Sequence, residues 1–562
     1  MKIKTTVLMI LLLGCLFRNA AAQPIHLVNP ILSGFYPDPS IVKVGADYYL
    51  VNSTFSYFPG LPLFHSKDLK NWEQLANIIS RKSQMDFIGE RMTRGLFAPG
   101  ISYYKGTFYV TCTNIDNKGN FVVTARNPAG PWSDPVWLPK VRGIDPSIFF
   151  DGGKAYVVYN SDPPDYKPLY QGHRTIKMFE FDIENLTTIG EEKIVVNGGV
   201  DISKKPVWIE GPHLLKRNDW YYLYAAEGGT SVNHSEVVFR SKSVWGPYLP
   251  YEKNPILTQR DLPEDRKYPV TSTGHAQLVE GPDRKTYAVF LGVRPYTGDY
   301  YNTGRETFIA PVQWENDWPV INAGNAEVKY DYLADYKEVK LKNSIPQSGN
   351  FGYTLNFNSV LDPSLVFLRS CDSSSFSVNK TSGLWLKLKP ETCMGYGNPS
   401  FIGKRQQHLL CTAETELTFI PEKENEKAGL VIFQDEKHFY FIGKSVSGGK
   451  HVLQLFKSTG DGQTMELLAE APVAKEGQAV GLRIAAEGEY YSCSYASEPG
   501  HWVLLKDKLD GKFLSTHEAG GFIGCFFGLY ATSSGMTSHN SASFKYLRYD
   551  GTDEVYKKQN TK

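Results

Sequence analysis

Five short segments rich in aromatic and β-branched residues recur along the first 320 residues of this 562-residue chain. Corresponding positions in successive segments lie 47 to 66 residues apart, and most segments follow a turn signal such as Gly45-Ala46-Asp47. Self-similarity at this spacing is typical of architectures that repeat one small β-sheet. The segments are residues 47–51, 107–111, 154–158, 220–224 and 286–290.

A second motif with a tryptophan follows four of the segments, at Trp72, Trp132, Trp245 and Trp318. No convincing amphipathic helix interrupts this part of the chain, so the pattern predicts an all-β fold. Five copies of one unit predict a five-bladed β-propeller over residues 24–335, with room in each copy for loops that build a site. A pair of β-sandwiches is the alternative, but it would not explain five copies of the same unit.

The repeat stops at a mostly polar linker between residues 335 and 349. Alternating strands separated by glycine-containing turns follow it, which predicts a C-terminal β-sandwich over residues 350–552. The expected strands are residues 384–388, 416–419, 429–433, 439–443, 452–456, 480–484 and 522–530.

Residues 1–22 have the layout of an export signal: two lysines, an apolar run over residues 7–17, and a cleavage site at Ala20-Ala21-Ala22. The run is too short to cross a bilayer, and no later stretch predicts a transmembrane segment. We therefore predict secretion across the inner membrane, with the periplasm as the destination. The alternative is a lipid anchor on Cys15, because Leu12-Leu13-Gly14-Cys15 resembles a lipoprotein motif.

The charge balance and the cysteines exclude two further classes of protein. Lys and Arg together number 60 and Asp and Glu 59, so no basic surplus is present to neutralise phosphates, and a nucleic-acid partner is not expected. Six of the seven cysteines lie beyond the signal, and their spacing fits neither a dense disulfide framework nor a zinc site. Disulfides and buried free thiols both remain open, as does the oligomeric state.

Three acidic residues, Asp38, Asp145 and Glu210, occupy similar places in the repeat. Each precedes a repeated segment and is followed by a proline within two residues, which fits the start of a strand. One Asp-Pro can be a simple turn opener, but three acids at matching positions of a propeller would converge on its axis and shift each other's pKa. Glycoside hydrolysis requires such crowding, because one carboxyl protonates the leaving oxygen while another activates water.

Four motifs carry a resemblance to a known family. They are the run from Asn29-Pro30 to Gly34-Phe35-Tyr36-Pro37-Asp38-Pro39-Ser40, and the segments Ile144-Asp145-Pro146-Ser147, Trp208-Ile209-Glu210-Gly211-Pro212 and Gly304-Arg305-Glu306-Thr307. In combination these motifs are highly specific, and the chain resembles glycoside hydrolase family 43 over nearly all of its mature length. The resemblance implies a five-bladed propeller with exo-acting β-xylosidase or α-L-arabinofuranosidase activity. Residues 405–408, 428–430 and 528–531 are similar to the sandwich of one branch of the family.

The resemblance implies a role for each acid in a single-displacement hydrolysis with inversion. Asp38 would be the general base, Glu210 the general acid, and Asp145 the residue that tunes the pKa of the acid. In such a mechanism the base and acid carboxyls stand roughly 6.5–9.5 Å apart, with a water between them. Glu227, which comes after its strand rather than before it, is the rival acid.

The resemblance also implies the residues around the sugar. Arg305 matches an arginine near the sugar, although an ion pair is an alternative role, and Phe55 would form a hydrophobic wall. Phe97 and Ile144 replace the Trp and Phe with which xylosidase-like relatives line a xylopyranose pocket, and this difference favours arabinofuranose. His275 matches a histidine near the propeller axis that can hold a water or a calcium ion, with a satisfied core histidine as the alternative. No cofactor is expected to be required.

We therefore expect an exo-acting α-L-arabinofuranosidase that acts on hemicellulose oligosaccharides, with β-D-xylosidase activity as the alternative. A non-catalytic sugar-binding propeller would keep the aromatic residues and could lose the acids, but all three acids are present. The sandwich is either a separate carbohydrate-binding module or a lid that narrows the propeller's pocket, and the resemblance favours the lid.

Overall fold

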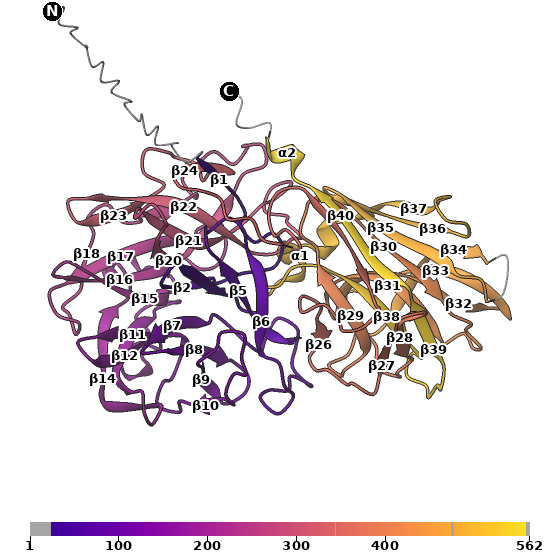
Figure 1. Cartoon of the computed structure of the whole chain (residues 1–562), viewed down its shortest axis with the longest axis horizontal. Helices are drawn as coiled ribbons and strands as arrows, with labels where there is room; N and C mark the ends of the chain where they lie inside the picture. The colour runs from indigo at the N-terminus through magenta and orange to yellow at the C-terminus, as the bar shows by residue number, and fades with distance from the viewer. Residues whose placement is uncertain (1–23, 343, 474–476, 558–562) are drawn as a thin grey trace, which may run out of the picture.

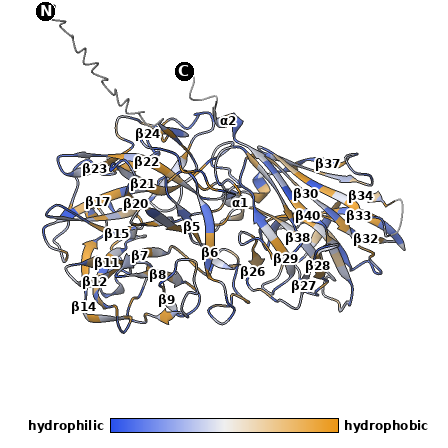
Figure 2. Cartoon of the chain, in the orientation of Figure 1, coloured by the Kyte–Doolittle hydropathy of each residue, from blue (hydrophilic) through white to orange (hydrophobic). Residues whose placement is uncertain are grey.

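The computed structural model describes residues 24–342, 344–473 and 477–557. The expected export signal and Cys15 lie outside these residues. Two β-rich bodies lie side by side, one built from the indigo to pink part of the chain and the other from the orange to yellow part (Figure 1). Hydrophobic and hydrophilic residues are interleaved along the strands of both bodies (Figure 2), as expected for sheets that bury one face or both.

The N-terminal body contains five antiparallel sheets that follow one another in chain order. The first is β2 (Ser40–Val44), β3 (Asp47–Val51), β5 (Gly60–Ser66) and β6 (Glu73–Ile79). The second is β7 (Gly100–Tyr104), β8 (Thr107–Asn114), β9 (Gly119–Ala125) and β10 (Val136–Trp137), and the third is β11 (Ile144–Asp151), β12 (Lys154–Ser161), β13 (Thr175–Asp182) and β14 (Thr187–Asn197).

The last two sheets complete the series. The fourth is β15 (Glu210–Arg217), β16 (Trp220–Glu227), β17 (Ser235–Ser241) and β18 (Leu249–Pro250), with β19 (Leu257–Thr258) also paired to β17. The fifth is β20 (Thr271–Glu280), β21 (Thr286–Val293), β22 (Glu306–Glu315) and β23 (Trp318–Ile321).

The first strands of the five sheets meet in a closed ring, because β2 contacts β7, β7 contacts β11, β11 contacts β15, β15 contacts β20, and β20 contacts β2. This is the arrangement of a β-propeller with one sheet per blade. The five repeated segments of the sequence are the second strands of the sheets: β3, β8, β12, β16 and β21. Outside the ring, β1 (Ile25–Val28) pairs with β24 (Asp331–Ala334) and joins the two ends of the propeller.

The C-terminal body is a sandwich of a nine-stranded and a six-stranded sheet. The larger sheet contains β25 (Phe351–Asn356), β27 (Phe376–Asn379), β28 (Gly383–Lys387), β30 (Leu410–Thr418), β35 (Val480–Glu487), β36 (Tyr490–Ala496), β37 (Val503–Asp510), β39 (Ser541–Phe544) and β40 (Tyr546–Thr552). The smaller contains β29 (Ser400–Arg405), β38 (Phe526–Thr532), β31 (Lys427–Asp435), β32 (His438–Ser447), β33 (Lys450–Ser458) and β34 (Met465–Pro472).

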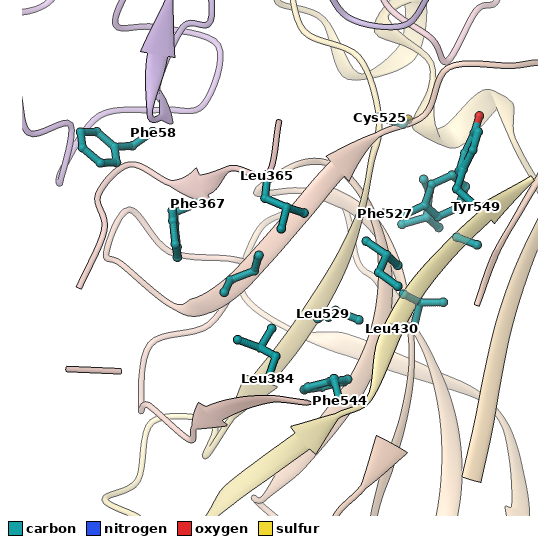
Figure 3. Packing of buried hydrophobic residues seen from close by; sticks show 14 of the residues in the cluster. Phe58, Leu365, Phe367, Leu384, Leu430, Cys525, Phe527, Leu529, Phe544 and Tyr549 are labelled. Carbon is teal, nitrogen blue, oxygen red and sulfur yellow. The ribbon is translucent and has the colours of Figure 1, made fainter. Parts of the chain in front are cut away.

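The core of the sandwich lies between its two sheets. Leu384 and Phe544 of the larger sheet belong to the same buried cluster as Leu430 and Leu529 of the smaller one (Figure 3). Helical structure in the described residues is confined to short pieces: η1 (Pro164–Tyr166), η2 (Ile202–Lys204), η3 (Lys512–Leu514), α1 (Thr516–Ala519) and α2 (Glu554–Lys557). None of the helices in this described part is long and apolar enough to cross a membrane.

The two bodies are joined by a pair of hydrogen-bonded strands as well as by side-chain contacts. β4 (Tyr57–Phe58), in the first blade, pairs with β26 (Phe367–Leu368), and Phe58 lies opposite Phe367 (Figure 3). The six cysteines of the described residues are all free thiols; Cys371 is partly exposed and the others are buried. Of the two alternatives left open by the sequence, disulfides or free thiols, the described residues therefore show free thiols.

Candidate active site

A cavity of about 670 Å³ opens on the propeller axis at the end where the first strands begin. Asp38 lies two residues before β2, Asp145 is the second residue of β11, and Glu210 is the first residue of β15. The ring of first strands therefore brings all three acids to one end of the axis, and all three line the cavity. The other lining residues include Phe55, Arg94, Phe97, Ile144, Arg174, Trp208, Thr230, His234, His275, Arg305 and Phe522.

The backbone around the acids adopts conformations that few residues tolerate. Asp38 and Asp145 have φ values of 51° and 57°, in the left-handed region where Asp and Asn are the more acceptable non-glycine residues. Such conformations cost about 1–3 kcal/mol each and persist when the surrounding structure imposes them. Gly211, which follows Glu210, is also left-handed (φ 59°), and a Cβ there would lie 2.8 Å from the His275 ring. Close packing under the cavity thus fixes the direction of the acids.

Asp38 is buried and held as a carboxylate. Arg305 donates to its Oδ1 at 2.6 Å, and the Ser53 hydroxyl donates to its Oδ2 at 2.6 Å. Burial favours the neutral acid, but the charge of Arg305 and the hydrogen bond from Ser53 outweigh burial and hold the pKa of Asp38 below its usual value. Arg305 therefore forms the ion pair that the sequence left open, and it does so while it lines the cavity.

Asp145 and Glu210 form a pair that retains a proton. Burial and the charges of Glu210 and Asp38 raise the pKa of Asp145 well above its usual value. Burial and the charge of Asp38 raise the pKa of Glu210 to about 7. The Gly211 N–H donates to Asp145 Oδ2 at 3.0 Å, which stabilises the charged form of Asp145, whereas the Glu210 carboxyl has a longer contact, 3.3 Å, with the Thr230 hydroxyl. The pair therefore retains a proton near neutral pH, and the hydrogen bond from Gly211 favours the arrangement in which Asp145 carries the charge and Glu210 the proton.

Aromatic side chains from both bodies form one wall of the cavity. The rings of Phe55 and Phe97 lie 5.3 Å apart, and Phe522 of the sandwich lies 5.9 Å from each of them. We expected Phe522 to begin a strand, and this prediction is wrong: β38 begins at Phe526, and Phe522 lies in the preceding loop, where its N–H donates to the Thr93 hydroxyl. The sandwich thus narrows the propeller's pocket, as a lid would.

The sandwich also supports the segment that carries Asp38. The Arg405 guanidinium lies 4.3 Å from the Tyr36 ring and donates to the Phe35 carbonyl at 2.7 Å. Gln407 donates to the Ser33 carbonyl at 3.0 Å. The turn that presents Asp38 is therefore held from the second body as well as from its own blade.

His275 lines the cavity and is buried, with Nδ1 3.9 Å from Asp38 Oδ1. Burial lowers its pKa, so the ring is neutral at pH 7. A calcium ion needs six to eight oxygen ligands, and the described residues contain no cluster of three or more Asp, Glu, His or Cys that could hold a metal ion. The protein groups at His275 do not by themselves fit calcium, so a calcium ion at this position stays a prediction.

Sequence reasoning missed several residues of this site. Trp208 and Arg174 line the cavity together, and Arg94 lies above Phe97 with its guanidinium 5.6 Å from the ring centre. Trp208 stands in the same motif as Glu210, and this proximity was an available signal. Arg174 and Phe522 come from loops whose local sequence carries no sign of the site. Glu227 does not line the cavity, and its carboxylate instead accepts the Val200 N–H at 3.0 Å.

A β-propeller with three converging carboxylates, one charged and one protonated near neutral pH, has the active site of a glycosidase. The comparisons with known proteins place the chain more closely: it belongs to glycosyl hydrolases family 43, whose model matches residues 27–319. The beta xylosidase C-terminal concanavalin A-like domain matches residues 355–550. The predicted fold class and family are therefore confirmed.

Relatives of similar sequence cover almost the whole chain. A xylosidase/arabinosidase of Butyrivibrio fibrisolvens is 39% identical over 92% of this chain and 98% of its own length. A non-reducing end alpha-L-arabinofuranosidase of Bacteroides ovatus is 37% identical over 96% of this chain and 98% of its own. The crystal structure of a GH43_12 protein retrieved from a capybara gut metagenome is 40% identical, with a TM-score of 0.84 over 91% of this chain and 96% of that one.

Proposed function

We propose that the protein is an exo-acting α-L-arabinofuranosidase that releases terminal arabinofuranosyl residues from hemicellulose oligosaccharides with inversion. The observation that carries the mechanism is the difference in environment between the acids: Arg305 pairs with Asp38, whose pKa is lowered, whereas burial and the charge of Asp38 raise the pKa of Glu210 to about 7. In the proposed reaction, Asp38 removes a proton from water, which attacks the anomeric carbon. Glu210 protonates the departing oxygen, and Asp145 keeps the pKa of Glu210 high enough for that task.

The choice of arabinofuranose rests on the walls of the cavity. Phe97 and Ile144 replace the larger aromatic pair expected around a xylopyranose, and both line the cavity. The relative from Bacteroides ovatus supports the same sugar by its name. β-D-Xylosidase activity is the second candidate, because the relative from Butyrivibrio fibrisolvens carries both activities in its name. Export to the periplasm, or a lipid anchor at Cys15, remains part of the proposal on the strength of residues 1–22 alone.

Parallel hydrolysis of 4-nitrophenyl α-L-arabinofuranoside and 4-nitrophenyl β-D-xylopyranoside tests the sugar. We expect faster turnover of the arabinofuranoside, and a clear preference for the xyloside would select the second candidate. Proton NMR of the first-formed product tests the stereochemistry, and a retained anomer would overturn the inverting mechanism. Sugar binding without turnover of either substrate would instead identify a non-catalytic binding propeller.

Asp145→Asn should move the basic limb of the pH–rate profile. Glu210 must be protonated to act as the acid, so activity falls as the pH rises through its pKa. Removal of the Asp145 charge removes repulsion and lowers the pKa of Glu210, so the basic limb should move to lower pH by roughly one unit. The matched control is Asp151→Asn at the other end of β11, where Asp151 pairs with Lys216. An unchanged basic limb in Asp145→Asn would exclude the proposed tuning role.

A further inference from the structure

Trp208 is a partly exposed aromatic residue whose backbone segment is held by two hydrogen bonds. It lines the cavity and keeps 39% of its surface exposed. Its N–H donates to the Gly172 carbonyl at 2.9 Å, and the Gly228 N–H donates to the carbonyl of the preceding Val207 at 2.8 Å. Its φ of 53° is left-handed, a conformation that bulky residues avoid unless their surroundings impose it. The surrounding structure therefore holds Trp208 in a strained backbone conformation that places its ring at the cavity.

One face of the Trp208 ring is covered by the Arg174 guanidinium, 4.8 Å from the ring centre. Arg174 is fixed in turn by the Asn160 side-chain oxygen, which accepts from its Nε at 3.1 Å and its Nη2 at 2.8 Å, and by an ion pair with Asp162. Asn160 also donates to the Ile209 carbonyl, next to Glu210. Trp208 and Arg174 thus form a supported platform, and Asn160 links it to Ile209, the residue directly before Glu210.

The platform stands beside the proposed proton donor. Trp208 and Glu210 flank the buried Ile209, and both line the cavity. The proposed acid must reach the oxygen that joins the terminal sugar to the next one, so the leaving sugar lies against the wall near Glu210. A flat aromatic face on that wall is suited to the C–H face of a pyranose ring, since aromatic rings offer a large apolar surface at small entropic cost.

We propose that Trp208, braced by Arg174, is the binding subsite for the leaving sugar, and that its ligand is a pyranose such as a xylosyl unit. This inference rests on the proposed function, because it assigns the second sugar of the same cleavage reaction. Trp208 acts in binding and takes no part in proton transfer. The terminal sugar is recognised separately, by Phe55, Phe97, Phe522 and Arg305.

The test compares two substrates that share the terminal sugar and differ in the leaving group. One is a disaccharide in which that sugar is linked to xylose, and the other is the glycosyl azide of the same sugar, whose leaving group is too small to cover a tryptophan. Trp208→Ala should lower kcat/KM for the disaccharide by roughly 10-fold, mainly through KM. Its kcat/KM for the azide should stay within about threefold of wild type.

Two further variants separate binding from damage to the fold. Trp208→Phe keeps an aromatic face and should recover much of the disaccharide activity. Trp385→Ala removes a partly exposed tryptophan of the sandwich and should leave kcat/KM unchanged for both substrates. Equal losses on both substrates in Trp208→Ala, or no loss on the disaccharide, would overturn the subsite. Failure of the proposed function can be told apart from failure of the subsite, because the wild-type enzyme would then cleave neither substrate.

Discussion

Asp38→Asn should abolish most of the turnover on every substrate, with a loss of roughly 10²-fold or more. The substitution keeps the shape of the side chain and removes the negative charge that is proposed to take a proton from water. Water must be activated whatever group departs, so the loss should be similar for aryl glycosides and for oligosaccharides. Initial rates of both substrate types, measured across the pH range, provide the test.

A control is needed because Asp38 is also the buried partner of Arg305. Loss of one partner of a buried ion pair destabilises a protein, so thermal unfolding of the variant should be measured alongside its rates. Asp47→Asn, at the far end of the β2–β3 hairpin, removes a partly exposed carboxylate of the same blade and should leave turnover unchanged. A folded Asp38→Asn enzyme with wild-type rates on both substrates would contradict its role as the base.

The repeat in the sequence predicted the propeller because each blade has the same internal order. The aromatic segments are the second strands, which lie inside their sheets, and strands such as β8 and β12 are buried along almost their whole length, so both faces carry mostly buried side chains. The equivalence of Asp38, Asp145 and Glu210 followed from the same order, since each lies close to the start of a first strand. Circular closure then turned equivalent positions in sequence into proximity in space.

The sandwich was predicted less completely, for a physical reason. Its central strands, such as β31 and β32, are buried along most of their length and are evident as hydrophobic runs. Edge strands such as β37, Val503–Asp510, expose most of their side chains, and the local sequence then carries little β-pattern. Strand β37 was missed for this reason, but β29 was also missed although all its residues are buried, so burial alone does not make a strand evident in the sequence.

The same distinction explains which parts of the site were missed. Phe522 reaches the cavity from a loop that precedes β38, and its place depends on how the two bodies pack rather than on local sequence. Arg174 lies between Asn160 and Trp208, a contact made by separate segments of the third and fourth blades. The left-handed backbone of Asp38 and Asp145 was equally hidden, because Asp-Pro permits several turn conformations.

Glu210→Gln should produce a loss that depends on the leaving group. An oligosaccharide releases a poor leaving group that must receive a proton, so its turnover should fall by roughly 10²-fold or more. Nitrophenolate departs without a proton, so the variant should retain far more activity on nitrophenyl glycosides, and the basic limb of its pH profile should disappear there. Glu227→Gln is the matched control, because Glu227 lies outside the cavity lining and should show no such dependence. Equal losses on both substrate types in Glu210→Gln, or leaving-group dependence in Glu227→Gln, would show that Glu210 is not the general acid.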